Sequence, residues 1–435
     1  MERTFGAEHE MGVTLNNKDF FCALNGKYPY DYSQQDEIDI LNEFFLEGMQ
    51  RHDSFQRNGG KLGIDMYHVE YSTPECISPE EAALYVHGTD LLFHMKVLNL
   101  QARNIPIKVY RDNTDWHEGF YAMHENYLVV TPVNNKANFN LSLVAYLATQ
   151  PIWGGAGVID PMTGEVSCSV QAVFDPETYR GYALKLMHGS EEQENTYARL
   201  EIRGEANGLH EITFLKFAIT SLVLSMLESE FMDWDEYIPE GDGFIYAERL
   251  NSLVGDIAVM TLGGNKVTAL EAQQHFASSI KLFLDYRSLT GLGVPTWAYA
   301  ALERFQAVLE QIDTFMKTGT CQAPYLTDWL CKKYILDEWR LSGMKETEDV
   351  RRALCMAYHD TNPEESLLEG LYVDGKAIRY FATSELLNTI SFPGKHPRAN
   401  ARSKEYYKLK GKKGVEISWR SVSVDGHITE LPFSL

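Results

Sequence analysis

The sequence predicts a mixed α+β fold, and three observations favour it. Segments with apolar residues at alternate positions, typical of strands, are concentrated in the first half of the chain. Segments with helical spacing lie between these strands and dominate from about residue 255 to 360. The chain has no internal repeat, low-complexity segment or long Gly/Ser linker, so we do not expect a repeat array.

The predicted strands begin at the N-terminus. RTFGAEHEMGVTL, residues 3–15, alternates with period two and places Glu8 and Glu10 on one face. In RNGGKLGIDM, residues 57–66, an Asn-Gly-Gly turn signal opens into a strand. Further strands are predicted in IPIKVYRDNTD, GFYAMHENYLVVTP, VSCSVQAVF and RLEIRGEAN.

Helices are predicted between and after these strands. Residues 34–51 place apolar side chains at helical spacing: Ile38, Leu41, Phe45 and Met49. Another helix begins at Ser78, the expected N-cap, with Pro79 at its first position. We also predict helices over 140–149 and 211–230, and a mostly helical region over 255–360.

Two Asp-Gly signals lie near the end of the chain, in YVDGKAI at 374–375 and in SVDGHITEL at 425–426. Asp-Gly favours β-hairpins because a type I′ turn needs positive φ at both central residues. We therefore predict two hairpins that bracket a strand-rich tail. The expected organisation is a large domain at 1–365 and a small C-terminal domain at 366–435.

A formal net charge of −22 over 435 residues limits the expected partners. So acidic a chain argues against nucleic acid or an anionic membrane as the main partner. Six scattered cysteines without CxxC spacing fit a reduced compartment better than a disulfide framework. The charged N-terminus lacks the apolar core of a signal peptide. We expect a cytoplasmic protein.

Glu8 and Glu10 are the first candidate site residues. Two carboxylates on one strand face repel each other, so burying them together requires a cation. They fit a solvated sheet edge and, equally, a pair of ligands for Mg²⁺, which prefers oxygen donors.

Two further segments carry polar side chains. In KLGIDMYHVEYSTPEC, residues 61–76, His68 and Glu70 share strand parity, whereas Asp65 needs a bulge or turn at Met66–Tyr67 to reach their side. In DNTDWHEGFYAMHENYL, His124 and Asn126 share parity and suit metal or phosphate contacts. No HExxH or cysteine spacing supports zinc. A structural histidine hydrogen-bonded to nearby acids is the alternative for His68.

Basic residues in so acidic a chain are a signal of anion recognition, although ordinary surface ion pairs are the alternative. The candidates lie in RLEIRGEAN and PRANARSKEY: Arg199, Arg203, Arg398 and Arg402. The sequence has no GxxxxGK[ST] and no GxGxxG motif, so neither a P-loop nor a Rossmann nucleotide site is supported.

The same segments resemble, in order and spacing, the Pup ligase and depupylase family, whose catalytic domain is related to glutamine synthetase and glutamate–cysteine ligase. GAEHEMG is similar to its G-x-E-x-E-[FY]-G signature, and RNGGKLGIDMYHVEYSTPEC to its aspartate-bearing segment. DNTDWHEGFYAMHENYL, RLEIRGEAN, TDWLCKKYIL and VEISWRSV resemble further family segments. The resemblance covers nearly the whole chain. It implies a glutamine-synthetase-like, curved and mostly antiparallel sheet packed with helices.

The resemblance also implies roles for particular residues. The acidic sheet face of the family binds Mg²⁺ and ATP, so the expected metal ligands are Glu8, Glu10, Glu70 and His124. Asp65 falls on the essential aspartate and would deprotonate the incoming amine. Asn126 and Arg199 would lie near the nucleotide, Arg402 and Trp419 would complete the site, and Arg203 would replace an arginine that the family carries nearby.

Departures from the family pattern leave the reaction open. MHGSEEQENTYARL stands where the family has T-R-D-E-P-H-A-D, and Val69 replaces a proline. Glu8 and Asp65 are 57 positions apart, the compact spacing of ligases, whereas the D-x-x-H spacing is that of depupylases. The favoured interpretation is a ligase that joins a Pup-like modifier or a small carboxylate to a lysine-bearing protein or small amine. A depupylase-type hydrolase with ATP as cofactor and a non-catalytic nucleotide-binding homologue are the alternatives.

Overall fold

The computed structural model describes residues 3–15, 18–19, 54–65, 68–114, 116, 121, 123–130, 143, 145–170, 184–187, 197–231, 259–261, 264–409, 412 and 414–432. The helix predicted over 34–51 lies outside these residues. Two compact units interleave along the chain. We call Thr4–Met123, His359–Ser366 and Phe381–Leu435 the sheet unit, and Met1–Arg3, His124–Tyr358 and Leu367–Tyr380 the helical unit. The predicted boundary at residue 365 stays a prediction.

The sheet unit is built around strand β1 (Phe5–Leu15), which was predicted from the alternation of residues 3–15. β1 pairs with β2 (Lys18–Asp19), β5 (His68–Ser72) and β6 (Ile107–Tyr110). β4 (Lys61–Asp65) forms a hairpin with β5 and also pairs with β3 (Ser54–Phe55). The strand predicted after the Asn-Gly-Gly signal is thereby confirmed.

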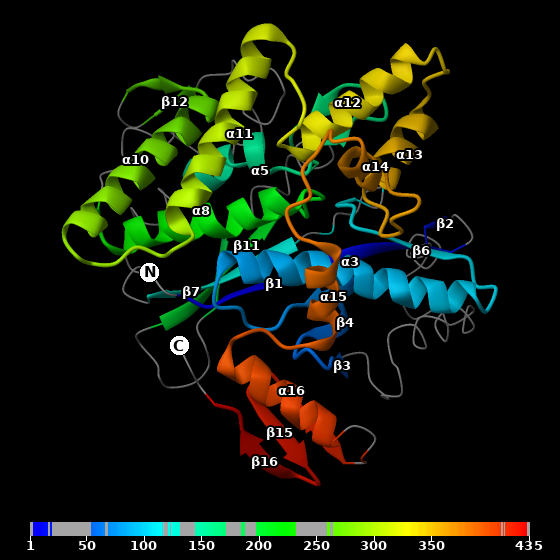
Figure 1. Ribbon diagram of the computed structural model, residues 1–435, viewed down its shortest axis with the longest axis vertical. Helices are drawn as coiled ribbons and strands as arrows, with labels where there is room; N and C mark the ends of the chain where they lie inside the picture. Colours follow the sequence, from blue (N-terminus) through cyan, green and yellow to red (C-terminus); the bar gives the residue numbers. More distant parts are fainter. Residues whose placement is uncertain are drawn as a thin grey trace. The chain divides into compact units, whose positions relative to one another are not determined.

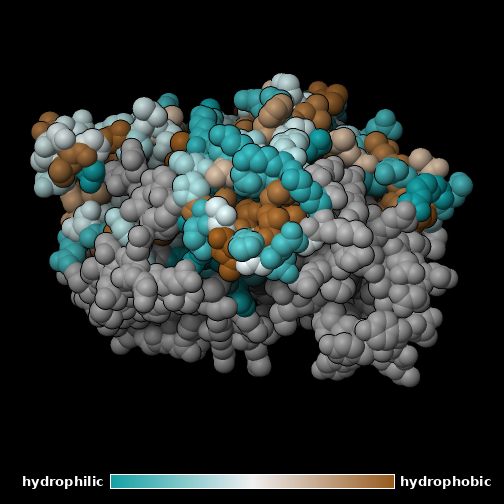
Figure 2. All heavy atoms as spheres, turned by 90° about the horizontal axis from the view of Figure 1, so that it is seen from below, coloured by the Kyte–Doolittle hydropathy of each residue, from teal (hydrophilic) through white to brown (hydrophobic). Residues whose placement is uncertain are grey.

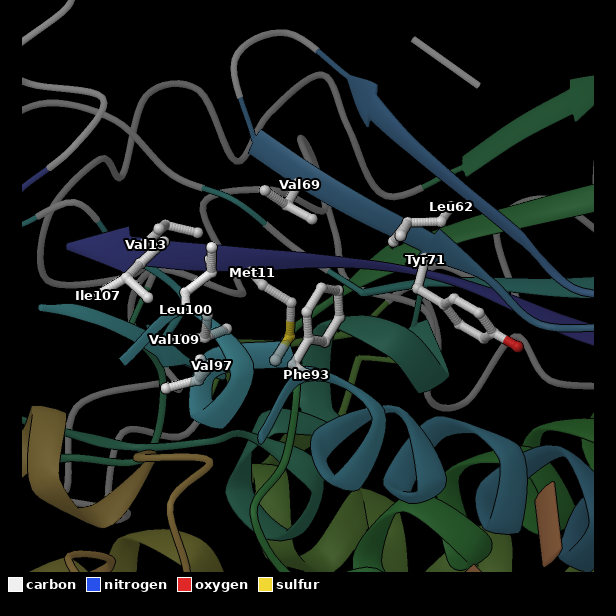
Figure 3. Close-up of a cluster of buried hydrophobic side chains, with 10 residues drawn as sticks. All are labelled: Met11, Val13, Leu62, Val69, Tyr71, Phe93, Val97, Leu100, Ile107 and Val109. Atoms are coloured by element: carbon white, nitrogen blue, oxygen red, sulfur yellow. The ribbon is translucent and has the colours of Figure 1, made fainter. Parts of the chain in front are cut away.

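Helix α3 (Pro79–Gln101) covers one face of this sheet (Figure 1). Its start is as predicted, since the Ser78 side chain accepts a hydrogen bond of 3.1 Å from the Glu81 amide and Pro79 follows it. Figure 3 shows the buried core between the helix and the strands: Met11, Val13, Leu62, Val69, Tyr71, Phe93, Val97, Leu100, Ile107 and Val109. Because side chains alternate along a strand, the opposite face of β1 and β5 carries Glu8, Glu10 and Glu70.

The end of the sheet unit contains α15 (Thr383–Ser391), α16 (Pro397–Leu409) and an antiparallel sheet of β14 (Val415–Ile417), β15 (Ser421–Val424) and β16 (His427–Glu430). The hairpin predicted at Asp425–Gly426 is confirmed, and both residues have positive φ, 49° and 84°. α15 packs closely on α3, because a Cβ on Gly88 would lie 1.8 Å from the Thr389 hydroxyl.

The hairpin predicted at Asp374–Gly375 is wrong. Residues up to Val373 form helix α14 (Leu367–Val373), and Gly375, with φ of 66°, follows its end. A glycine with left-handed backbone shortly after the last helical residue is also a helix stop signal. The tail is therefore not uniformly strand-rich, since helices α14, α15 and α16 precede its three strands.

The helical unit contains β7 (Met123–Val130, from His124 on) beside β11 (Tyr197–Gly204), which pairs with β10 (Leu184–Met187). Short strand pairs are β8 (Val158–Ile159) with β9 (Val166–Ser167), and β12 (Val259–Met260) with β13 (Lys266–Val267). Residues 143 and 145–149 are helical, in the region predicted over 140–149. The strand predicted in VSCSVQAVF is present only at β9 among the described residues.

Helices make up most of this unit (Figure 1): α5 (Pro151–Gly154), α8 (His210–Glu228), α10 (Ala269–Leu289), α11 (Ala298–Thr318), α12 (Asp328–Leu341), α13 (Glu348–Tyr358) and α14. α8 is long and apolar enough to cross a membrane, but 94% of that window is buried inside the structure, as in a core helix. Every strand pairing of known register is antiparallel. The predicted α+β class with a mostly antiparallel sheet is confirmed.

Candidate functional site

The face of β1 and β5 opposite α3 brings three of the predicted acidic residues together. The antiparallel register sets Glu10 opposite Glu70, and it sets Glu8 opposite Ser72. Directly opposed residues share a face and lie close together, so Glu8, Glu10 and Glu70 form one acidic cluster. The Ser72 hydroxyl donates a 3.2 Å hydrogen bond to the Glu70 carboxylate, which fixes one edge of the cluster.

The chemistry of this cluster suits a hard cation. Glu10 is only 7% exposed, so water screens its charge poorly. Like charges opposite each other on a sheet are destabilising unless a cation lies between them or a proton is taken up. Carboxylate and hydroxyl oxygens are the ligands that Mg²⁺ prefers in proteins. The donors on this face therefore fit Mg²⁺.

Asp65 lies at the end of the β4–β5 hairpin. It pairs directly with His68 across the two residues that separate the strands, so its backbone position belongs to the face of His68 and Glu70. Met66 and Tyr67, where the sequence predicts a bulge or turn, lie outside the described part of the chain.

The ring of Tyr121 packs against the ring of His68. The two rings are 4.6 Å apart between centroids and tilted by 37°. The Tyr121 hydroxyl lies against Gly12 of β1, where a Cβ would come within 2.2 Å of it. Gly12 therefore leaves the room that Tyr121 occupies beside His68. No local sequence pattern predicts this contact, because residues 12, 68 and 121 belong to three separate segments.

The helical unit holds a second group of polar side chains, on β7 and β11. Asn126 accepts a 2.6 Å hydrogen bond from the Arg199 Nε, so these two predicted nucleotide-binding residues are in contact. Arg199 also lies 3.4 Å from Glu201, and so does Arg203. A ring nitrogen of His124 and a carboxylate oxygen of Glu201 are within 4.8 Å of each other.

Glu201 is a candidate that the sequence analysis missed. Its side chain is 3% exposed, whereas those of Arg199 and Arg203 are 40% and 28% exposed. It therefore lies inside, between two arginines that reach solvent. The available signal was strand alternation, which puts residues 199, 201 and 203 on one face of β11.

Arg402 is buried in the sheet unit, with no exposed side-chain surface. Its guanidinium forms a two-pronged ion pair with Glu75 and donates to the carbonyls of Gly59 and Trp419, both at 2.8 Å. The same group lies over the Trp419 ring at 4.6 Å and the Phe55 ring at 5.2 Å. These contacts fasten α16 to β3 and to the loop before β15. A nucleotide-binding role for Arg402 and Trp419 stays a prediction.

Comparisons with known proteins relate the chain to one protein family. A family model described as "Pup-ligase protein" matches residues 3–423. The chain is 25% identical over 419 residues to a Pup–protein ligase of Nakamurella multipartita, covering 92% of this chain and 88% of the relative. It is 26% identical over 389 residues to a depupylase of Acidothermus cellulolyticus, covering 85% of this chain and 74% of the relative.

Two solved structures share the fold. The ligase PafA in complex with Pup, the prokaryotic ubiquitin-like protein, superposes with a TM-score of 0.82 at 21% identity and covers 100% of this chain and 89% of that one. PafA in complex with ADP gives 0.76 at 21% identity, with 92% and 91% covered. The superpositions confirm the expected fold class. Since the family model extends over nearly the whole sequence, this chain belongs to the Pup-ligase protein family.

Proposed function

We propose that this protein is an ATP- and Mg²⁺-dependent ligase that joins a glutamate carboxylate of a Pup-like modifier to a lysine of an acceptor protein. Membership of the family supports the reaction, and the relatives named Pup–protein ligase support the direction. The observation that carries the proposal is the register of β1 and β5, which opposes Glu10 to Glu70 with Glu8 beside them. Since the reaction consumes ATP, we place it in the cytoplasm.

We assign Glu8, Glu10, Glu70 and His124 as the Mg²⁺ ligands. When bound, Mg²⁺ would offset the negative charge of the ATP phosphates. We assign Asn126, Arg199 and Arg203 to the nucleotide, where the two partly exposed guanidiniums supply charge-assisted hydrogen bonds. Arg402 and Trp419 would complete the site.

The chemistry requires activation of a carboxylate, which is a poor electrophile. Transfer of the terminal phosphoryl group of ATP to the glutamate carboxylate would give an acyl phosphate. Attack by a neutral lysine amine would then form the isopeptide bond and release phosphate. The amine must first lose a proton, and we assign that step to Asp65 as general base, with His68 opposite it in the hairpin.

One observation favours a second candidate, a depupylase-type hydrolase that keeps ATP as a cofactor. Asp65 and His68 are separated by two residues, the spacing that resembles depupylases, and a depupylase is among the relatives. In that reaction Asp65 would assist attack on the isopeptide carbonyl, directly or through water. A non-catalytic homologue is the third candidate, but it has no reason to keep the acidic cluster.

The deciding experiment measures ADP formation from Mg-ATP, with and without Pup ending in glutamate and a lysine-bearing acceptor. A ligase forms ADP in proportion to conjugate, and Asp65→Asn should abolish both while nucleotide binding persists. Asp374→Asn, an exchange at an exposed turn, is the matched control. Conjugate cleavage without stoichiometric ADP would favour the hydrolase, and absence of both activities would contradict the proposal.

A further inference from the structure

Three segments that lie far apart in the sequence meet on the acidic face of the sheet. Gly12 follows Glu10 by two positions on β1, and His68 precedes Glu70 by two positions on β5. Since side chains alternate along a strand, both positions belong to the face that carries these glutamates. Tyr121 comes from the segment before β7. All three residues are part of the sheet unit.

Tyr121 lies between the other two residues. Its ring centroid is 4.6 Å from that of His68, and a Cβ on Gly12 would come within 2.2 Å of its hydroxyl and 3.0 Å of its ring carbon Cζ. Hydrophobic side chains also reach the surface of this protein, as the face drawn in Figure 2 shows, but Tyr121 is buried, with only 5% exposed. The tyrosine therefore fills a space that Gly12, which has no side chain, leaves open.

The described residues ahead of Tyr121 include a strained one. Trp116 has a φ of 62°, in the left-handed region that bulky residues rarely adopt. Its amide donates a 3.0 Å hydrogen bond to the Thr114 hydroxyl, and its indole donates a 2.8 Å hydrogen bond to the Asp112 carboxylate. The Tyr121 amide donates to the Asn113 carbonyl at 3.4 Å. Backbone strain persists only where surrounding contacts enforce it, and it is concentrated at functional sites.

His68 connects this packing to the residue proposed as the base. It pairs with Asp65 at the end of the β4–β5 hairpin, where only two residues join the strands. Because paired residues of a hairpin are held together, a contact that restrains His68 also restrains the backbone of Asp65. The placement of a catalytic group matters on this scale, since an error of about 1 Å can lower a rate about a hundredfold.

We propose that Tyr121 is a positioning residue for the attack of the amine. By packing between Gly12 and His68, it holds the end of the β4–β5 hairpin in place, and with it Asp65. This inference rests on the ligase reaction proposed above, because it assigns Tyr121 to the step in which Asp65 takes a proton from lysine. Formation of the acyl phosphate does not depend on Tyr121.

Hydroxylamine separates the two steps. It is a weak base and is uncharged at neutral pH, whereas the lysine ammonium, with a pKa of about 10.4, must first lose a proton. The hydroxylamine nitrogen attacks the acyl phosphate carbon, phosphate leaves with the electron pair of the broken C–O bond, and the nitrogen releases a proton to water, which gives a hydroxamate. Hydroxamate formation therefore reports on the acyl phosphate without requiring the base, whereas conjugate formation requires both.

The test compares both products in the full-length protein, with saturating Mg-ATP, Pup ending in glutamate, and either a lysine-bearing acceptor or hydroxylamine. Tyr121→Leu should slow conjugate formation about tenfold or more, while hydroxamate formation and the KM for ATP stay close to those of the wild type. Tyr121→Phe keeps the ring against His68 and should retain most of the conjugation rate. Tyr299→Leu is the matched control, because Tyr299 is 42% exposed and donates a hydrogen bond to Asp285. It should change neither product.

A second pair of variants changes Gly12 instead. Gly12→Ala places a Cβ against the Tyr121 hydroxyl, so it should cause the same selective loss of conjugate. In Gly12→Ala/Tyr121→Phe the nearest ring atom is Cζ, at 3.0 Å instead of 2.2 Å, so part of the conjugation rate should return. Recovery on adding a second substitution would identify the contact between these two residues as the cause, since two independent losses would add.

Loss of conjugate and hydroxamate in the same proportion in Tyr121→Leu would overturn the proposal, because Tyr121 would then support the fold or the nucleotide site. An unchanged conjugation rate in Tyr121→Leu would overturn it as well. A wild-type protein that forms neither product would refute the proposed ligase itself, and the inference with it. A loss confined to the variants leaves the ligase reaction standing.

Discussion

Lys216 and Glu125 form an ion pair inside the helical unit, with 3.0 Å between Nζ and Oε1 and only 1% of each side chain exposed. Lys216, from α8, also donates a 2.7 Å hydrogen bond to the Glu205 carbonyl at the end of β11. The Tyr127 hydroxyl donates to the other oxygen of Glu125. Glu125 and Tyr127 alternate along β7 with His124 and Asn126, so this buried network fixes the back of the strand that presents both site residues.

Lys216→Met should lower the free energy of unfolding by about 3–5 kcal/mol, because it leaves Glu125 charged and buried without its partner. The double variant Lys216→Met/Glu125→Leu should recover much of that loss. Urea denaturation followed by circular dichroism measures both. Equal losses in the single and double variants would show that packing, and not the unpaired charge, dominates this site.

The acidic cluster gives a prediction about nucleotide binding. Glu10→Gln keeps the size of the side chain and removes one of the two charges that face each other across β1 and β5. We expect the affinity for ATP in the presence of Mg²⁺ to fall about tenfold or more, by analogy with the loss of partners around metal sites. Isothermal titration of a non-hydrolysable ATP analogue, with Mg²⁺ and with EDTA, measures the change.

Glu80→Gln is the matched control, because Glu80 is an exposed acid in the first turn of α3. It should leave the affinity unchanged. If Glu10→Gln binds the analogue like the wild type in Mg²⁺, the assignment of Glu10 as a ligand fails. A loss that persists equally in EDTA would place Glu10 near the nucleotide but not on the metal.

The sequence predicts which segments of the site form strands, but not how those strands pair or which distant side chains come into contact. Alternation placed Glu8 and Glu10 on one face, since period two is a local property of the chain. The opposition of Glu10 and Glu70 depends on register, which is decided by pairing between distant segments. Arg402 illustrates the same limit. No local pattern in PRANARSKEY predicts that its guanidinium forms an ion pair with Glu75, which lies 327 positions away in the sequence.

Helix α14 and the Asp374–Gly375 pair that follows it allow a test of the helix stop found in place of the predicted hairpin. Gly370 lies inside the helix with open space at its Cβ position, and Gly375 has a φ of 66°. Gly370→Ala should stabilise the protein by about 0.5–1 kcal/mol through helix propensity. Gly375→Ala should destabilise it by about 1–2 kcal/mol because of left-handed strain. Changes of the same sign in thermal unfolding would contradict the helix stop assigned here.

The Arg402–Glu75 contact predicts that lysine is a poor substitute. Arg402→Lys keeps the charge but loses the two-pronged geometry and the planar stacking on Phe55 and Trp419. We expect the free energy of unfolding to fall by about 2–3 kcal/mol. A lysine ammonium would leave some of the buried acceptors that Arg402 now satisfies without a hydrogen bond. Trp419 fluorescence should change with it. Arg420→Lys, at a neighbouring exposed arginine, is the control, and an equal effect there would contradict the role of Arg402.

Asp360 gives a pH dependence of stability. Burial raises the pKa of its carboxyl from 3.8 to about 6, although the Asn362 amide and Lys108 work in the opposite direction. Between these two values the folded state binds a proton that the unfolded state releases, so the free energy of unfolding falls as pH rises through about 4 to 6, by at most about 3 kcal/mol.

Asp360→Asn should remove this dependence. The stability advantage of this variant over the wild type should therefore grow from pH 4 to pH 7 in urea titrations. Asp374→Asn, an exposed exchange, should leave the wild-type slope intact. A wild-type stability that rises with pH across this window, unchanged by Asp360→Asn, would show that the buried carboxyl is charged at no cost to the fold.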